Sequence, residues 1–434
     1  MTEPLDHEVD CGCQEYQDLS RRQFVGLGAG AAAAYYYPDW LPRVVLAQSQ
    51  ASNRDVIVSV FQRGGADGLN LVVPFGDPAY YTGRSSIAIP RPDANVAANQ
   101  KVTALDNFYG FAPGMTPLLP AYNAGHLLVM QAAGLQTVVT RSHFDAQRWM
   151  EVGKPADVNY VTGWLGRHLS LVPPMRTDAP LRALGLASGL AKTLVGGPKT
   201  LPIANPASFT IGGAANTAAA RQAVLATDYN NAPAPLNASA LDAINTIALL
   251  QTVNINAYTP NNSVVYPNSG FGRSLRSVAA LIRADVGIEA AQVDIGGWDT
   301  HAAQGGATGA MSTLTLDFAS SLAAFYADII ATNARVTVVI ISEFGRNARE
   351  NGSQGTDHGR ASAMFAMGQG IAGGRVYVNS WPGLAMENLE ARQDLRVTLD
   401  YRDVLAEIVQ RRLGNSQIAQ VFPGWNATFR GVTR

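Results

Sequence analysis

The stretch of sequence that decides the fold is VTVVIISEFGR, residues 336–346. Its first six residues form a mostly apolar, β-branched run, which is typical of a strand buried on both faces of a parallel sheet. The chain then turns to polar residues and a glycine, as it does where a strand ends in a loop. We therefore predict an inner strand over residues 336–341, with Glu343 and Arg346 at its carboxyl end.

Four other segments show a similar short apolar run that ends in polar or glycine-rich sequence: residues 56–61, 127–132, 291–295 and 363–367. Apolar residues at helical spacing lie between or after these runs, from residue 146 onward and over 241–256, 274–285, 314–331 and 401–413. This alternation predicts an α/β fold with a doubly wound, mostly parallel sheet of the alkaline phosphatase-like type. Residues 173–269 are rich in Ala, Asn, Pro and Ser, and we expect them to form an insertion or cap.

The composition excludes several classes of protein. Of the 434 residues, 47% are hydrophobic and 15% are charged, which fits a globular protein with a large core and excludes a disordered chain. The net charge of −1 provides no field that would attract nucleic acid or an anionic membrane. We therefore expect no nucleic-acid partner.

The N-terminal residues resemble a twin-arginine signal peptide. The sequence SRRQFV at residues 20–25 precedes a Gly- and Ala-rich apolar run, and VLA at residues 45–47 offers a cleavage site. We expect a leader over residues 1–47, a mature domain over 48–434, contact with the twin-arginine translocase, and a periplasmic or extracellular location. Both cysteines, Cys11 and Cys13, lie in the leader, so the mature domain would hold no thiolate metal ligand.

Polar residues that suit chemistry follow the predicted strands. They are Asp67 after the first strand, Arg141, Ser142 and His143 after the second, Asp299 and His301 after the third, Glu343 and Arg346 after the fourth, and Asp357 and His358 in the next loop. Ligands of open α/β sheets bind at the carboxyl ends of the strands, so these side chains are expected to converge.

Carboxylates and imidazoles in this arrangement favour a divalent-metal site. The candidate ligands are Asp67, Asp299, His301, Glu343, Asp357 and His358. Ser142, at the start of a predicted helix, is placed to attack a phosphoryl or sulfuryl group, His143 is a candidate base, and Arg141 and Arg346 are candidates to hold the oxygens of an anionic substrate. We expect one or two ions of zinc, manganese or calcium.

Several of these residues also have structural interpretations. Asp67 could satisfy the amides of a glycine-rich turn, and Ser142 could be only a helix N-cap. His143 could be a structural hydrogen-bonding partner, and Glu343 could pair with Arg346. At this stage both interpretations remain open.

The segments FQRGGADGLN (61–70), RSHFD (141–145), GGWDTH (296–301), SEFGR (342–346) and DHG (357–359) resemble those of the exported bacterial family catalogued as domain of unknown function 1501, within the alkaline phosphatase and sulfatase superfamily. The wider superfamily implies a doubly wound sheet, a two-metal centre and a hydroxyl nucleophile. By that likeness Asp67, Asp299, His301 and His358 match metal ligands and Ser142 matches the nucleophile. Phe344 stands where a second imidazole is expected and cannot bind a metal.

Two functions follow as hypotheses. The first is an exported metal-dependent hydrolase of phosphate or sulfate esters, acting on an anionic small molecule or polymer. The alternative is a non-catalytic exported binding protein that retains a hydrolase-like fold with a degenerate metal site, with an exported partner protein possible in either case. A redox enzyme has little support, because no Gly-x-Gly-x-x-Gly turn joins a strand to a helix.

Overall fold

The computed structural model describes residues 54–434, so the leader expected over residues 1–47 lies outside the described residues. A nine-stranded mixed sheet forms the centre of this part, with strand order β11-β5-β10-β9-β1-β8-β6-β7 and β12 paired to β5. The strands pair in parallel except β10, which runs antiparallel to both of its neighbours, β5 and β9. The predicted α/β class with a mostly parallel sheet is confirmed at this level.

The five predicted strands are all present in the sheet. They are β1 (Val56–Gln62), β5 (Leu127–Gly134), β8 (Ala290–Ile295), β9 (Val336–Ser342) and β10 (Ser362–Met367). The pleat explains their apolar composition, because Val58 and Val60 of β1 belong to the core on one face of the sheet while Ile57 and Phe61 belong to the core on the other. Strands buried on both faces need apolar residues at every position.

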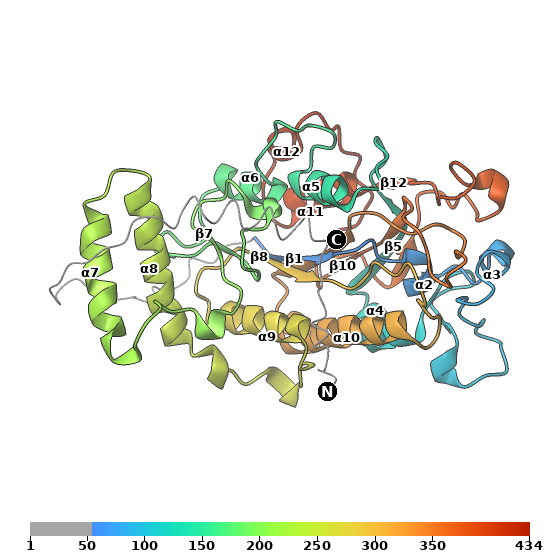
Figure 1. Cartoon of the computed structure of the whole chain (residues 1–434), viewed down its shortest axis with the longest axis horizontal. Helices are drawn as coiled ribbons and strands as arrows, with labels where there is room; N and C mark the ends of the chain where they lie inside the picture. The colour runs from blue at the N-terminus through green and yellow to red at the C-terminus, as the bar shows by residue number, and fades with distance from the viewer. Residues whose placement is uncertain (1–53) are drawn as a thin grey trace, which may run out of the picture. The chain divides into compact units, whose positions relative to one another are not determined.

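Helices cover both faces of the sheet (Figure 1). One face carries α5 (His143–Val152), α6 (Trp164–Leu171) and α11 (Tyr401–Arg411). The other face carries α9 (Gly270–Arg283) and α10 (Ala310–Phe325), which continues through a π-helical turn, Tyr326–Ile330. By length and composition α10 and this turn could cross a membrane, but Phe318, Leu322 and Phe325 are buried in the core, as in the core helix of a globular protein.

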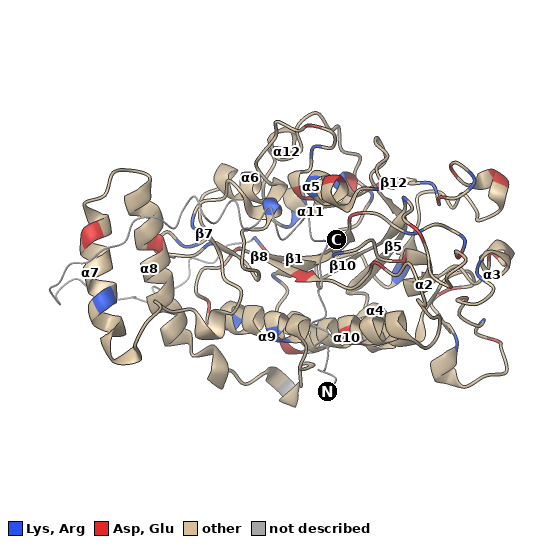
Figure 2. Ribbon diagram, viewed as in Figure 1, with Lys and Arg blue, Asp and Glu red and all other residues tan. Residues whose placement is uncertain are grey.

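The segment over residues 173–269, predicted as an insertion or cap, contributes two strands to the sheet. It supplies β6 (Ala183–Gly185) and β7 (Thr200–Pro202), which extend the sheet beyond β8. It also forms a hairpin of α7 (Ala218–Asn230) and α8 (Leu236–Val253), drawn in green at the left of Figure 1. Figure 2 shows few charged residues on this hairpin.

The remaining described helices and strands are short. They are α2 (Gly68–Leu71), α3 (Pro78–Gly83), α4 (Leu119–Asn123), α12 (Ile418–Val421), β11 (Arg375–Tyr377), β12 (Leu399–Asp400), and a separate small sheet of β2 (Val72–Val73), β4 (Gly110–Phe111) and β3 (Thr103–Ala104).

We expect His168 of α6 to lower the stability of the folded protein at acidic pH. Burial lowers the pKa of His168 to about 3, and Arg54 and Arg182 act in the same direction. The Asn415 amide donates to its Nδ1 atom at 3.2 Å, which fits a neutral ring. The unfolded chain takes up this proton near pH 6.5, so stability is expected to fall between about pH 6.5 and pH 3, by up to about 1.4 kcal/mol per pH unit.

The His168→Gln variant should lose this part of the pH dependence, because Gln can accept from Asn415 without taking up a proton. Urea unfolding of both proteins at neutral pH and at about pH 4.5 measures the difference. Equal loss of unfolding free energy in the two proteins on acidification would contradict the prediction.

Candidate metal centre

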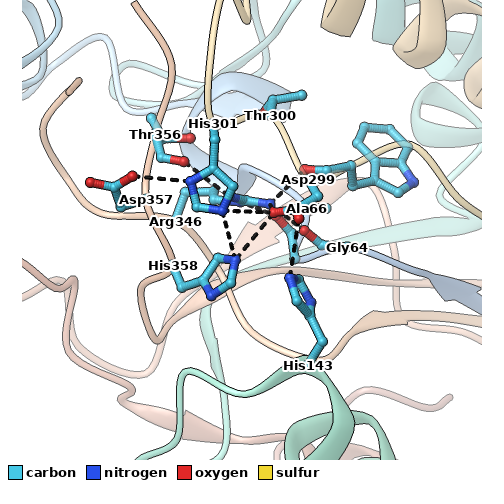
Figure 3. A network of polar contacts seen from close by, with 12 residues as sticks. Gly64, Ala66, His143, Asp299, Thr300, His301, Arg346, Thr356, Asp357 and His358 are labelled. Atoms are coloured by element: carbon cyan, nitrogen blue, oxygen red, sulfur yellow. Dashed lines mark hydrogen bonds and ion pairs between the residues drawn. The ribbon is translucent and has the colours of Figure 1, made fainter. Parts of the chain in front are cut away.

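The candidate site lies where four strands end. β5 is antiparallel to β10 and β10 is antiparallel to β9, so β5 runs in the same direction as β9, β1 and β8. Their carboxyl ends therefore share one edge of the sheet, which brings the loops that follow them together. His143 opens the helix after β5, Asp299 and His301 follow β8, and His358 lies in the loop from β9 to β10 (Figure 3).

Asp299 is the centre of the cluster. Its Oδ1 atom lies 3.1 Å from Nε2 of His358 and 3.1 Å from Nε2 of His301. Its Oδ2 atom lies 3.4 Å from Nε2 of His143. Three imidazoles, one from the start of α5 and two from different loops, thus face a single carboxylate with the same ring nitrogen.

The other nitrogen of each imidazole is held by an oxygen that can only accept. Nδ1 of His143 lies 2.9 Å from Oε1 of Glu343, and Nδ1 of His301 lies 3.0 Å from Oδ1 of Asp357. Nδ1 of His358 lies 2.8 Å from the backbone oxygen of Arg141. Each Nδ1 therefore carries the proton, which leaves a lone pair on each Nε2 when the rings are neutral.

Lone pairs that face one another repel, and a cation between them removes the repulsion. The Nε2 atoms of His301 and His358 are only 2.9 Å apart, and Nε2 of His143 is buried with Oδ2 of Asp299 at the long distance of 3.4 Å. A proton or a metal ion relieves this repulsion. The ligand atoms of His143, Asp299 and His358 all lie within 4.8 Å of one another, a spacing that one ion can bridge. An imidazole whose far nitrogen donates to a carboxylate is also the usual arrangement of a metal-bound histidine.

Hydrogen bonds shift the pKa of His143 and of the two carboxyl groups beside it. Burial alone would lower the pKa of His143, but hydrogen bonds to Asp299 and Glu343 raise it to about 9. Burial would raise the pKa of Glu343, yet hydrogen bonds from His143 and Gln147 hold it below its usual value. For Asp299, burial is likewise outweighed by hydrogen bonds from His143, His358 and Arg346, which lower its pKa. Both carboxyl groups are therefore ionised.

Arg346 serves the scaffold of the site. Its guanidinium is fully buried and donates to Oδ1 of Asp299 at 2.5 Å. The same side chain donates to the backbone oxygens of four other residues: Gly64, Gly65, Trp298 and Thr356. With its donors used in this way, Arg346 fixes loops and the position of Asp299, which differs from the predicted role as a clamp for substrate oxygens.

Phe344 forms an apolar wall of the cluster. Its ring centroid lies 4.8 Å from that of His143 and 4.8 Å from that of His358. It is buried, so the position where the family likeness places a second imidazole instead packs against the two rings that are present.

Three predicted site residues have other partners. Asp67 is buried and pairs with Arg84, with Nη1 to Oδ2 at 2.5 Å, and it also accepts from Nε2 of Gln304 at 2.6 Å. Ser142 is the exposed N-cap of α5, and its Oγ atom accepts the amide hydrogen of Asp145. Arg141 donates to Asp394 at 2.8 Å. The Ser142 contact matches its structural interpretation as a helix N-cap, whereas Asp67 and Arg141 have partners that were not predicted. The roles of all three in metal binding and catalysis stay predictions.

Glu343 and Asp357 lie at the site but behind the imidazoles. Oε1 of Glu343 already accepts from the backbone amide of Gly64, from His143 and from Gln147, at 2.8 to 2.9 Å. Asp357 accepts from His301 and from Asn351. Their contacts are those of groups that orient histidines.

Sequence reasoning missed Arg84, Gln147 and Asn351. Gln147 had a usable signal, because it lies four residues after His143 and so on the same side of the predicted helix. Asn351 and Arg84 had none, since their contacts depend on how separate loops pack.

Close approach of two loops at the site requires a glycine at position 64. Gly64 has φ +117°, and a Cβ atom there would lie 2.7 Å from the backbone nitrogen of Asp299. The Gly64→Ala variant should therefore lose about 1–3 kcal/mol of stability and hold metal more weakly, because the Asp299 loop must move.

The matched control is Gly212→Ala, since a Cβ atom at Gly212 would meet nothing within 4 Å. Urea unfolding and metal titration of both variants measure the two effects. Equal behaviour of Gly64→Ala and Gly212→Ala would show that the close approach is unimportant.

Comparison with known proteins identifies a family. A search of curated proteins gives no match. Residues 54–422 match the family described as "Protein of unknown function (DUF1501)", and this range contains every residue of the cluster. Because the match spans most of the sequence, the chain belongs to this family of proteins of unknown function.

Proposed function

We propose that this protein is an exported metal-dependent hydrolase of phosphate or sulfate esters, with one divalent cation held by His143, Asp299 and His358. The observation that carries the proposal is the convergence of three imidazole Nε2 atoms on Asp299, each with its Nδ1 atom anchored to an oxygen. Such anchoring orients the rings for a cation before it arrives.

The proposed ligands favour a single ion of a metal that binds imidazole nitrogen. Two imidazoles and a carboxylate suit zinc better than calcium, which takes oxygen ligands. A second ion would need further carboxylates, but Asp67 is paired with Arg84 and Glu343 is already bound by three donors.

A divalent cation at this position would polarise a phosphoryl or sulfuryl oxygen and lower the pKa of a hydroxyl group beside it. Asp299 and the imidazoles of His143 and His358 would hold it, with Arg346 keeping Asp299 in place. His301, whose side chain is 44% exposed, is accessible for proton transfer and is oriented by Asp357. The exposed Ser142 hydroxyl, one residue before His143, is the proposed attacking group.

The test combines metal analysis with an ester panel. The protein purified from its native compartment should contain about one zinc or manganese per chain and hydrolyse aryl phosphate or sulfate esters. His358→Ala should lose both properties and Ser142→Ala only the second. Metal-free protein that is inert on the panel would support the non-catalytic binding protein instead.

The export part of the proposal rests on the sequence at residues 20–25 and 45–47. Replacing Arg21 and Arg22 with Lys should retain the precursor in the cytoplasm, which cell fractionation measures. Unchanged export of that variant would remove the twin-arginine route from the proposal.

A further inference from the structure

We infer that the substrate of this site is an ester with no more than one negative charge, carrying an apolar group that packs against α5 and the loop that follows it. The inference rests on the proposed function and adds the substrate class to it. Two independent features carry it: the balance of charge at the cluster, and an apolar surface beside it.

The charges at the loaded site cancel. A divalent cation and the Arg346 guanidinium contribute three positive charges, and the ionised carboxylates of Asp299, Glu343 and Asp357 contribute three negative ones. Each of these carboxyl groups accepts hydrogen bonds from nitrogen donors, as a carboxylate does. Asp299 accepts from Arg346, Glu343 accepts from Gly64 and Gln147, and Asp357 accepts from Asn351. An electroneutral site gives little compensation to a dianion that leaves water.

The arginines near the site do not change this balance. Arg346 is buried and bound to Asp299 and to backbone oxygens. Arg141 pairs with the buried Asp394 at 2.8 Å. A phosphate monoester dianion would therefore meet the metal ion without a second cation to balance its charge, whereas a phosphate diester or a sulfate ester carries a single charge.

Exposed apolar side chains flank His143 along the chain. In the described part of the chain, four of the eight exposed large hydrophobic residues lie in the short segment that contains α5 and its flanking loops. They are Val139 (61% exposed), Phe144 (40%), Val158 (75%) and Val161 (69%), which we call the apolar rim. Exposed apolar side chains that lie together mark sites of contact with ligands or partners, and we infer that these four form such a surface.

Arg148 links α5 to the loop that carries two residues of the rim, Val158 and Val161. This residue lies one helical turn after Phe144 on α5 and donates to the backbone oxygens of Asp157, Val158 and Tyr160. The loop that carries Val158 and Val161 is thereby tied to the Phe144 side of α5. The charged groups of this loop are paired with each other, with Lys154 Nζ 3.0 Å from Asp157 Oδ2.

Phe344 continues the apolar character into the cluster, where it packs against the rings of His143 and His358. The occupant that fits both the ion and the rim is an ester whose organic group is aromatic or aliphatic. A sugar or nucleotide group would instead leave its polar atoms against valine and phenylalanine side chains.

The test measures binding of three probes to the zinc-loaded protein by titration calorimetry at about pH 8, where phenyl phosphate is a dianion. Diphenyl phosphate is a monoanion with apolar groups, and dimethyl phosphate is a monoanion without a large one. We expect diphenyl phosphate to bind about tenfold or more tightly than either of the others.

Two rim variants and one control locate the effect. Phe144→Ser and the double variant Val158→Ser/Val161→Ser should each weaken binding of diphenyl phosphate about tenfold and leave zinc affinity unchanged. Leu236→Ser, at an exposed leucine of the α7–α8 hairpin, should change neither. The double variant keeps the test valid if Phe144→Ser fails to fold.

Tighter binding of phenyl phosphate, no binding of any probe, or rim variants that bind like the unaltered protein would overturn the inference. These results differ from failure of the proposed function, in which the protein holds no metal or hydrolyses no ester.

Discussion

Asp299→Asn should lower the affinity for the metal on the order of 100-fold or more. Removing a group that only orients a ligand typically costs about 10- to 100-fold in metal affinity, and the loss of a direct ligand should cost more. The carboxylate faces all three imidazole Nε2 atoms, and an amide of the same shape supplies neither its charge nor its second oxygen acceptor. Hydrolysis of any ester substrate should fall with the metal. Competition with a chromogenic chelator measures the affinity directly.

The control is Asp294→Asn, which alters a carboxylate at the end of the same strand. Asp294 contacts Arg63 and Gln292 and none of the imidazoles, so metal affinity should stay as it is. Stability should fall moderately in Asp299→Asn, because Arg346 retains its backbone acceptors. Full retention of metal by Asp299→Asn would remove the basis of the proposed centre.

Asp67→Asn should have the opposite pattern, losing about 3–5 kcal/mol of unfolding free energy while retaining the metal. The carboxylate and Arg84 are both buried, and their two hydrogen bonds measure 2.5 and 3.0 Å. Removing the negative charge leaves a guanidinium uncompensated in the interior, although Arg84 keeps its bonds to Asn70, Asn347 and Ala348. Guanidinium chloride unfolding measures the loss.

Asp93→Asn is the matched control, because the Arg91–Asp93 pair has the same chemistry on the surface, with side chains 47% and 74% exposed. That change should cost less than about 1 kcal/mol. If Asp67→Asn instead lost its metal at unchanged stability, the predicted role of Asp67 as a ligand would be restored.

The sheet was predictable because its inner strands consist almost entirely of apolar residues. Residues 336–341 are apolar at every position but one, and burial on both faces accounts for that. β6 and β7 were missed because strands of three residues show no periodicity against which to test a pattern. The convergence of loops followed from the shared direction of β5, β1, β8 and β9.

The assignment of roles within the site was harder to predict. Asp67, Asp299 and Glu343 each follow a strand and look alike in sequence, yet one pairs with an arginine, one faces three imidazoles and one orients a histidine. The difference depends on Arg84 and Gln147, whose positions are set by tertiary packing. Gln147 could have been inferred from its helical spacing, and Arg84 could not.

The buried guanidinium of Arg346 has a consequence for where the protein can assemble. It joins the turn after β1, the loop after β8 and the loop before β10, which a small protein would often link by a covalent bridge. Residues 54–434 contain no cysteine, and the hydrogen bonds of Arg346 form without an oxidant. The three loops that Arg346 joins can therefore adopt the same geometry in a reducing or an oxidising environment.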